Sequence, residues 1–124
     1  MIALLTGEPG GAFVKQLLLQ NPGACYAHAL NLAEIYYIFL RRGGENAAEE
    51  AIEDLMHVGI IPRDDFDTVF WKEAATFKGR HAMALPDAFC LALARRIGGT
   101  AVTTDHQEFD PVVPLGIVPI VFIR

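Results

Sequence analysis

The chain has 124 residues, of which 52 % are hydrophobic and 20 % are charged, with a formal net charge of −5. This length suits one domain over residues 1–124, the apolar content excludes a disordered chain, and the negative charge argues against a passive nucleic-acid-binding surface. No apolar run approaches the roughly 20 residues that span a bilayer, and the start, MIALLTGEPGG, lacks the features of a signal peptide, so we expect a cytoplasmic protein without a membrane partner.

The first part of the chain predicts two helices around a short strand. Gly7–Gly11 breaks the chain, and the segment Ala12–Gln20 then reads as a helix. Ala24–His28 is a short strand candidate. Leu30–Arg42 carries apolar residues on nearly every side, which predicts a buried helix that Gly43 ends.

The middle of the chain is acidic and mostly helical. Residues 45–58 have the apolar spacing of an amphipathic helix, and Gly59–Ile61 is a strand candidate that Pro62 stops. Asp64–Lys78 predicts a helix with three acids in its first turn, where the helix dipole favours them. Because most acids of the chain lie in this region, we interpret them as a solvated face.

The last third predicts one helix and two strands. Pro86–Ile97 is expected to be a helix, followed by the strands Thr100–Thr104 and Ile117–Ile123, with Pro119 indicating a sheet edge. Short apolar strands that alternate with helices predict a three-layer α/β fold, a parallel sheet flanked by helices. Cys25 and Cys90 match no metal or redox spacing and are expected to be buried, reduced thiols.

Glu34 lies among apolar residues, with Leu30 and Ile38 on its side of the predicted helix. A carboxylate in such a setting needs a partner, because an unpaired buried charge costs several kcal/mol. A local explanation is equally open: Asn31 caps the helix, and Glu34 reaches back to it in a capping box.

Two further acids lie at the ends of predicted elements. Asp87 opens a helix, where a carboxylate is also favourable for purely structural reasons. Asp105 follows a strand directly, and ligands of parallel α/β sheets bind beyond the carboxyl ends of strands, although turns favour Asp as well. Glu108 and Asp110 follow and are candidates for a second metal, with a solvated loop as the alternative.

Considered together, Glu34, Asp87 and Asp105 are expected to lie on the same side of the sheet. Carboxylates that gather without bases between them repel one another unless a cation neutralises them. Oxygen ligands alone favour Mg²⁺ or Mn²⁺, which engage substrate phosphates and activate water for phosphodiester cleavage.

Three segments carry a resemblance to a known family: NLAEIYYIFLRRG, LPDAFCLALARRIGGTAVTTDHQEFD and GIVPIVFIR. In this order and spacing the chain resembles a PIN domain of the VapC toxin type over nearly its whole length. The resemblance implies a metal-dependent ribonuclease whose acidic site maps onto Glu34, Asp87 and Asp105, with Thr103 or Thr104 as a nearby hydroxyl. It also implies a homodimer and a cognate antitoxin protein as partner.

One departure from the family pattern concerns the start of the chain. In the family, a strand that ends in an Asp precedes the segment resembling MIALLTGEPGG, so we expect an N-terminally truncated PIN-like domain without the first acidic ligand. The segment is then expected to be helical, with pairing of residues 1–5 as a strand as the alternative.

These observations lead to three hypotheses. The first is a Mg²⁺- or Mn²⁺-dependent endoribonuclease, in which Lys78, Arg80, His81 and Arg41 are candidate phosphate contacts. The second is a catalytically impaired PIN-like binding module that dimerises and binds an antitoxin. The weakest is a nucleotide-binding fold, because GEPGG lacks the strand and spacing of a phosphate-binding loop.

Overall fold

The computed structural model describes residues 1–124, which form two compact units. Unit 1 comprises Met1–Arg63 and Ile123–Arg124, and unit 2 comprises Asp64–Phe122. Each unit contains one parallel pair of strands together with helices, so the predicted α/β class with parallel strands is confirmed. No helix is both long enough and apolar enough to span a membrane.

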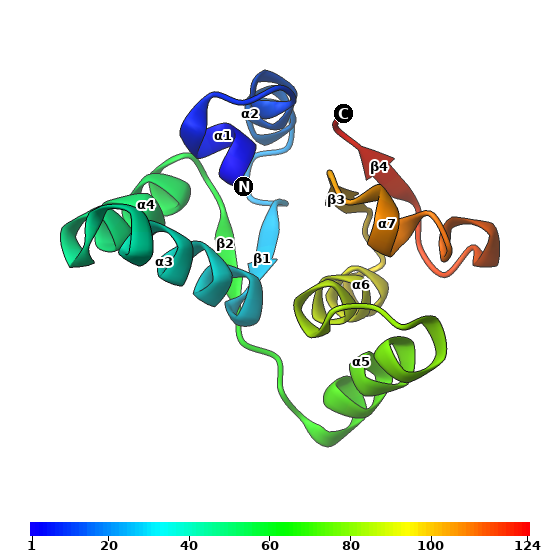
Figure 1. The fold of residues 1–124 in the computed structure, drawn as a ribbon. Helices are drawn as coiled ribbons and strands as arrows, with labels where there is room; N and C mark the ends of the chain where they lie inside the picture. The colour runs from blue at the N-terminus through cyan, green and yellow to red at the C-terminus, as the bar shows by residue number, and fades with distance from the viewer. The chain divides into compact units, whose positions relative to one another are not determined.

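Unit 1 begins with a helical pair and continues as strand–helix–helix–strand (Figure 1). Strands β1 and β2 run parallel, with Tyr26 opposite Ile61 and His28 opposite Arg63. Helices α3 and α4 pack against each other. The elements are α1 (Ile2–Thr6), α2 (Gly11–Gln20), β1 (Tyr26–His28), α3 (Ala29–Gly43), α4 (Glu45–His57) and β2 (Ile61–Arg63).

Two expectations about strands in unit 1 are wrong. Residues 1–5 do not pair as a strand, because Ile2–Thr6 is helical. Pro62 does not stop β2 but lies inside it. The Ile61 N–H donates to the Cys25 carbonyl at 2.9 Å, and in a parallel ladder the next nitrogen points away from that neighbour. Pro62 therefore occupies a position where a missing N–H costs no bond to β1.

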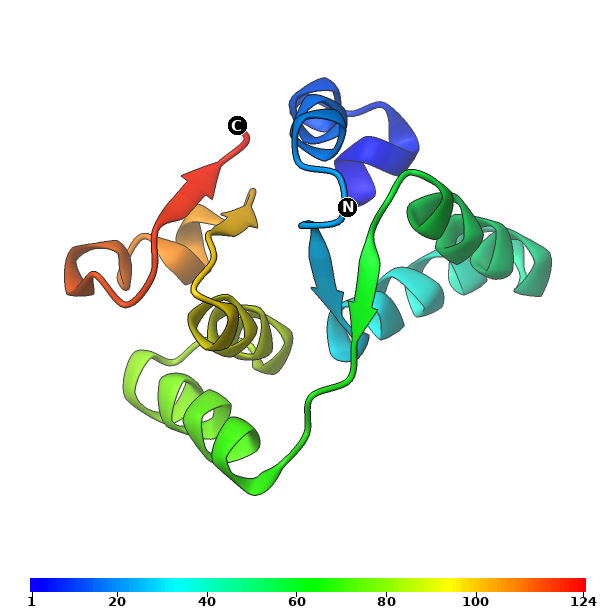
Figure 2. The same ribbon diagram turned by 180° about the vertical axis from the view of Figure 1, so that it is seen from behind.

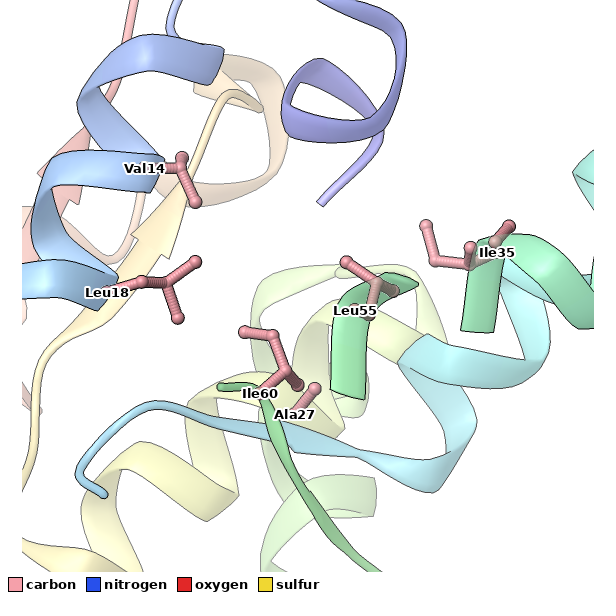
Figure 3. Packing of buried hydrophobic residues seen from close by; sticks show 7 residues of the cluster. Val14, Leu18, Ala27, Ile35, Leu55 and Ile60 are labelled. Carbon is pink, nitrogen blue, oxygen red and sulfur yellow. The ribbon is translucent and has the colours of Figure 1, made fainter. Parts of the chain in front are cut away.

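The core of unit 1 is a cluster of aliphatic side chains drawn from five segments (Figure 3). Leu55 on α4 is completely buried and Ile35 is the one buried residue of α3, so the prediction that α3 is buried nearly all round is wrong. Exposed Tyr37 and Leu40 lie on the same helix. The buried members are Val14, Leu18, Ala27, Ile35, Ala51, Leu55 and Ile60.

The glycines of GEPGG have a packing role. A Cβ on Gly11 would collide with the Ala3 backbone, and one on Gly10 would lie 2.8 Å from the Ile123 carbonyl oxygen. Gly10 also has a φ of +93°, which side chains rarely adopt. Close approach of Ala3 to Gly11 and of Ile123 to Gly10 explains these two glycines, and the GEPGG segment gives the nucleotide-binding hypothesis no support.

Unit 2 contains the helical pair α5 and α6 and the parallel strands β3 and β4 (Figure 2). Helix α6 is its most buried element, with six buried residues including Phe89 and Leu91. The prediction that Pro119 lies within the last strand is wrong, because β4 begins at the next residue, Ile120. The Pro119 carbonyl nevertheless accepts the Ala101 N–H at 3.0 Å. The elements are α5 (Thr68–His81), α6 (Leu85–Ile97), β3 (Ala101–Thr103), α7 (His106–Phe109), a 3-10 turn (Val113–Leu115) and β4 (Ile120–Phe122).

Arg96 in the last turn of α6 holds the start of α5. Its guanidinium contacts the Asp65 carboxylate at 3.0 Å and pairs through two nitrogens with Asp67. Asp67 is the N-cap of α5 and accepts the Phe70 N–H at 3.3 Å, so α5 starts later than the predicted Asp64. The Arg96 hydrogen bonds lower the pKa of Asp67 from its ordinary 3.8 to about 2.

The Asp67–Arg96 pair predicts a defined pH dependence of stability. Because the pKa of Asp67 is lower in the folded state, the pair contributes fully above about pH 4, and that contribution is lost as the pH falls toward 2. Asp67→Asn keeps a capping oxygen but not the charge. We expect wild type to melt above this variant at neutral pH and the difference to shrink between pH 4 and 2 in circular dichroism. Asp64→Asn is the control, and a pH-independent difference would contradict the assignment.

Leu55 tests the core of unit 1. Since this side chain is 0 % exposed, Leu55→Ala should lower the free energy of unfolding by about 2–5 kcal/mol in urea titration. Glu53→Ala on the exposed face of α4 should change it by no more than about 0.5 kcal/mol. Equal effects of the two substitutions would show that this cluster is not the core.

Candidate functional site

Asp105 lies at the carboxyl end of β3 and caps the short helix α7. Its Oδ1 accepts the Glu108 N–H at 3.0 Å, and its own N–H donates to the Thr103 hydroxyl at 3.0 Å. The side chain is half-buried. The predicted supporting hydroxyl, Thr103, thus fixes the backbone of Asp105, while Thr104 between them is half-buried as well.

Asp87 lies in the first turn of α6, three residues after the N-cap Ala84. It is half-buried, and the dipole of a 13-residue helix favours a negative charge there. Burial and then the charge of Asp87 raise the pKa of Cys90, one turn along, to about 11. Cys90 is therefore a protonated thiol at neutral pH and not a nucleophile. Cys25 is also a free thiol, with a pKa raised by burial.

Glu108 connects the elements that carry Asp87 and Asp105. Its Oε2 accepts the N–H of Ala84, the N-cap of α6, at 2.7 Å. Its own N–H donates to Asp105, as described above. One residue thus contacts the start of the helix that carries Asp87 and the carboxylate of Asp105.

Glu34 lies in the second turn of α3 in unit 1. Helix α3 is capped by His28, whose Nδ1 accepts the Leu30 N–H at 3.1 Å, so the alternative of a capping box on Asn31 is wrong. His28 is 3 % exposed and begins the helix three residues earlier than that alternative requires. Desolvation by burial raises the pKa of Glu34. Helix capping therefore does not explain this carboxylate.

The structure links the elements that carry two of the predicted site residues. Asp87 and Asp105 belong to unit 2, in elements joined by hydrogen bonds of Glu108. Glu34 belongs to unit 1, so its convergence with the other two stays a prediction. No group of three or more His, Cys, Asp or Glu side chains that could hold a metal is formed.

Comparison with known protein families matches residues 1–112 to the PIN domain. The chain belongs to the PIN domain family. No curated protein matches its sequence. PIN domains are generally nucleases and usually use divalent metals, which agrees with the carboxylates found at the ends of β3 and α6.

The side chains of this PIN domain fit a hard divalent cation by their chemistry. Mg²⁺ takes oxygen ligands, keeps several waters, and is bound through one or two carboxylates together with substrate phosphates. Asp87 and Asp105 supply carboxylate oxygens of this kind. Burial of Glu34 is unfavourable for its charge, as the pKa shift shows, and a nearby cation would offset this cost.

The four candidate phosphate contacts differ in their surroundings. The Lys78 ammonium donates to the Met83 carbonyl at 3.0 Å and thus ties the segment after α5 to the last turn of that helix. The Arg41 guanidinium lies over the Tyr37 ring, 5.0 Å from its centroid. Arg80 is exposed and His81 is half-buried, both in the last turn of α5.

Asp110, one of the two candidates for a second metal, contacts His106. The His106 Nδ1 lies 3.0 Å from Asp110 Oδ1, and the imidazole stacks on the Phe122 ring at 4.0 Å between centroids. Both polar side chains are more than half exposed. This pair joins the first residue of α7 to its C-cap residue on the exposed side of the helix.

Sequence reasoning missed the contacts of His28, Arg96 and Glu108. The sequence held a signal for Glu108, because Asp105 and Glu108 have the N-cap and N3 spacing of a capping box. In that motif Glu108 would bond the Asp105 N–H. That N–H already donates to the Thr103 hydroxyl, and the Glu108 carboxylate accepts the Ala84 N–H instead. Only the structure reveals this exchange, because Ala84 is 24 residues away.

The raised pKa of Glu34 predicts that its negative charge lowers the stability of the metal-free protein. Because its pKa is raised in the folded state, ionisation of Glu34 opposes folding, and stability falls as the pH rises through that range. Glu34→Gln should therefore raise the melting temperature in EDTA at neutral pH by a few degrees at most. Glu53→Gln on the exposed face of α4 is the control. A lower melting temperature for Glu34→Gln would mean that the carboxylate is stabilised by a protein partner.

Proposed function

We propose that this PIN domain is a Mg²⁺- or Mn²⁺-dependent endoribonuclease of the VapC toxin type, acting as a single domain over residues 1–124. Glu34, Asp87 and Asp105 are its catalytic carboxylates and metal ligands. The family match supports a nuclease. The toxin type rests on the resemblance of the segments around these three residues.

The observation that carries the proposal is the link between Asp87 and Asp105. They are distant in the sequence, yet Glu108 bonds the backbone at the start of one element and the carboxylate of the other. Both are half-buried, and carboxylates that lie close together are stabilised by a cation between them.

In the proposed reaction each carboxylate has a defined task. Asp105, fixed by Thr103 and Glu108, and Asp87, oriented by the first turn of α6, hold the cation, and Glu34 completes the ligand set. When bound by these carboxylates, a divalent ion would supply Lewis-acid chemistry at the phosphodiester and would favour ionisation of a water. Of the candidate phosphate contacts, Arg80 and His81 at the end of α5 and Arg41 on α3 present cationic or polar groups to RNA. Lys78 contributes mainly by holding the 82–84 segment.

The proposed partners follow from the same resemblance. A toxin ribonuclease of this type would work in the cytoplasm as a homodimer and be silenced by a cognate antitoxin protein. The apolar side chains exposed on α5, Val69 and Trp71, are compatible with a further protein contact.

Asp87→Asn and Asp105→Asn test the proposal. Asn keeps the shape of Asp and an oxygen for capping α7, so these variants should fold while losing the charge. We expect each to lower Mn²⁺-dependent cleavage of RNA by roughly 100-fold or more, since loss of even an outer-shell partner costs about 10–100-fold. Asp54→Asn, on the exposed acidic face of α4, should cleave like wild type.

Two outcomes would overturn the assignment. Undiminished cleavage by the double variant would show that other residues perform the reaction. A wild-type chain that neither binds Mn²⁺ in calorimetry nor cleaves RNA, but binds a cognate antitoxin tightly, would identify it as a catalytically impaired binding module.

A further inference from the structure

Glu108 had two interpretations from the sequence, a ligand of a second metal or a solvated loop residue. Its contacts point to a third role. The side chain is half-buried, and one carboxylate oxygen is committed to the Ala84 N–H at 2.7 Å, the distance of a strong hydrogen bond. Helix α6 has no side-chain cap of its own, and Glu108 supplies from α7 an acceptor for one N–H at its start, that of the N-cap residue Ala84.

Both ends of this hydrogen bond are attached to buried residues. On one side, Phe109 follows Glu108 and is 1 % exposed. On the other side, Met83 precedes Ala84 and is 1 % exposed, and its carbonyl accepts from Lys78. Two anchored segments joined by a short bond have little freedom to separate. The distance between α6 and the end of β3 is therefore fixed at this point.

Glu108 contacts one candidate metal ligand, Asp105, directly, and it contacts the start of the helix that carries the other, Asp87. Asp105 receives the Glu108 N–H, and Asp87 lies three residues after Ala84, within the same first turn. A change in the Glu108 side chain would thus release the start of the element bearing Asp87, while the backbone bond to Asp105 could persist. Groups that position metal ligands in this way set affinity without touching the metal.

We propose that Glu108 is a positioning residue that sets the separation of Asp87 and Asp105 through its bond to Ala84, and that it is not a metal ligand. This inference rests on the proposed function, since it assumes that Asp87 and Asp105 bind the cation. What the position requires is an acceptor oxygen at the reach of a Glu side chain. It does not require a negative charge.

Two substitutions separate the positioning role from ligation. Glu108→Gln keeps an acceptor oxygen at the same reach but removes the charge. Glu108→Asp keeps the charge but is about 1.5 Å too short to reach Ala84. A positioning residue tolerates Gln and not Asp, whereas a carboxylate ligand loses its function on the change to Gln.

The experiment measures two properties of the folded chain for wild type, Glu108→Gln, Glu108→Asp and the control Gln107→Ala, an exposed neighbour. The first is hydrogen exchange at the Ala84 amide in metal-free protein by NMR. The second is Mn²⁺ affinity by calorimetry. We expect Glu108→Gln and the control to stay within about threefold of wild type in both. Glu108→Asp should speed exchange at Ala84 and weaken Mn²⁺ binding by roughly 10–100-fold.

The outcomes distinguish this inference from the proposed function. Loss of Mn²⁺ affinity in Glu108→Gln with Ala84 still protected would make Glu108 a ligand and overturn the inference alone. Wild-type affinity in Glu108→Asp with Ala84 deprotected would show that the bond does not position the site. A wild-type chain that binds no Mn²⁺ would overturn the proposed function, and the inference with it.

Discussion

The hydrogen bond between the Ala84 N–H and the Glu108 carboxylate joins two segments that are far apart in the sequence. Ala84 is the N-cap residue of helix α6, the most buried element of unit 2, and Glu108 belongs to α7, the short helix that follows β3. Because α5 is held to α6 by Arg96, the position of α6 also determines where α5 begins. The placement of Asp87 relative to Asp105 thus depends on a contact that is neither a helix cap within one element nor a strand pairing.

Electrostatics gives the same region its chemical character. Asp87 and Asp105 are half-buried at positions where backbone N–H groups and helix dipoles favour negative charge. Glu34 in unit 1 lacks such support, since its pKa is raised by desolvation while His28 caps its helix. A carboxylate such as Glu34, whose charge is disfavoured by burial, lowers the stability of the fold, and such residues are typical of functional sites. In a member of the PIN domain family, a divalent cation is the partner that would offset the cost.

The sequence predicted the elements well because their signals are local. Apolar spacing and the glycines after each helix located α2, α4 and α6 to within a few residues. Local signals gave the wrong strand or helix limits where a contact with a residue distant in the sequence determines the structure. Pro62 lies inside β2 because only one side of that strand is paired with β1. Helix α5 begins at Thr68 because Asp67 caps it, and Arg96, 29 residues away, pairs with this N-cap carboxylate. For the site, residue type and element ends identified Asp87 and Asp105, but the role of Glu108 depends on Ala84 and was invisible.

The proposed function requires that Glu34, Asp87 and Asp105 bind one cation. Paramagnetic broadening by substoichiometric Mn²⁺ in NMR spectra of the full chain tests this directly, because Mn²⁺ broadens the signals of nuclei near its binding site. The account predicts that amides around Glu34, Asp87 and Asp105 broaden first and to a similar extent, and that Asp105→Asn suppresses the effect at all three. Broadening confined to the acidic face of α4, or restricted to one unit, would contradict it.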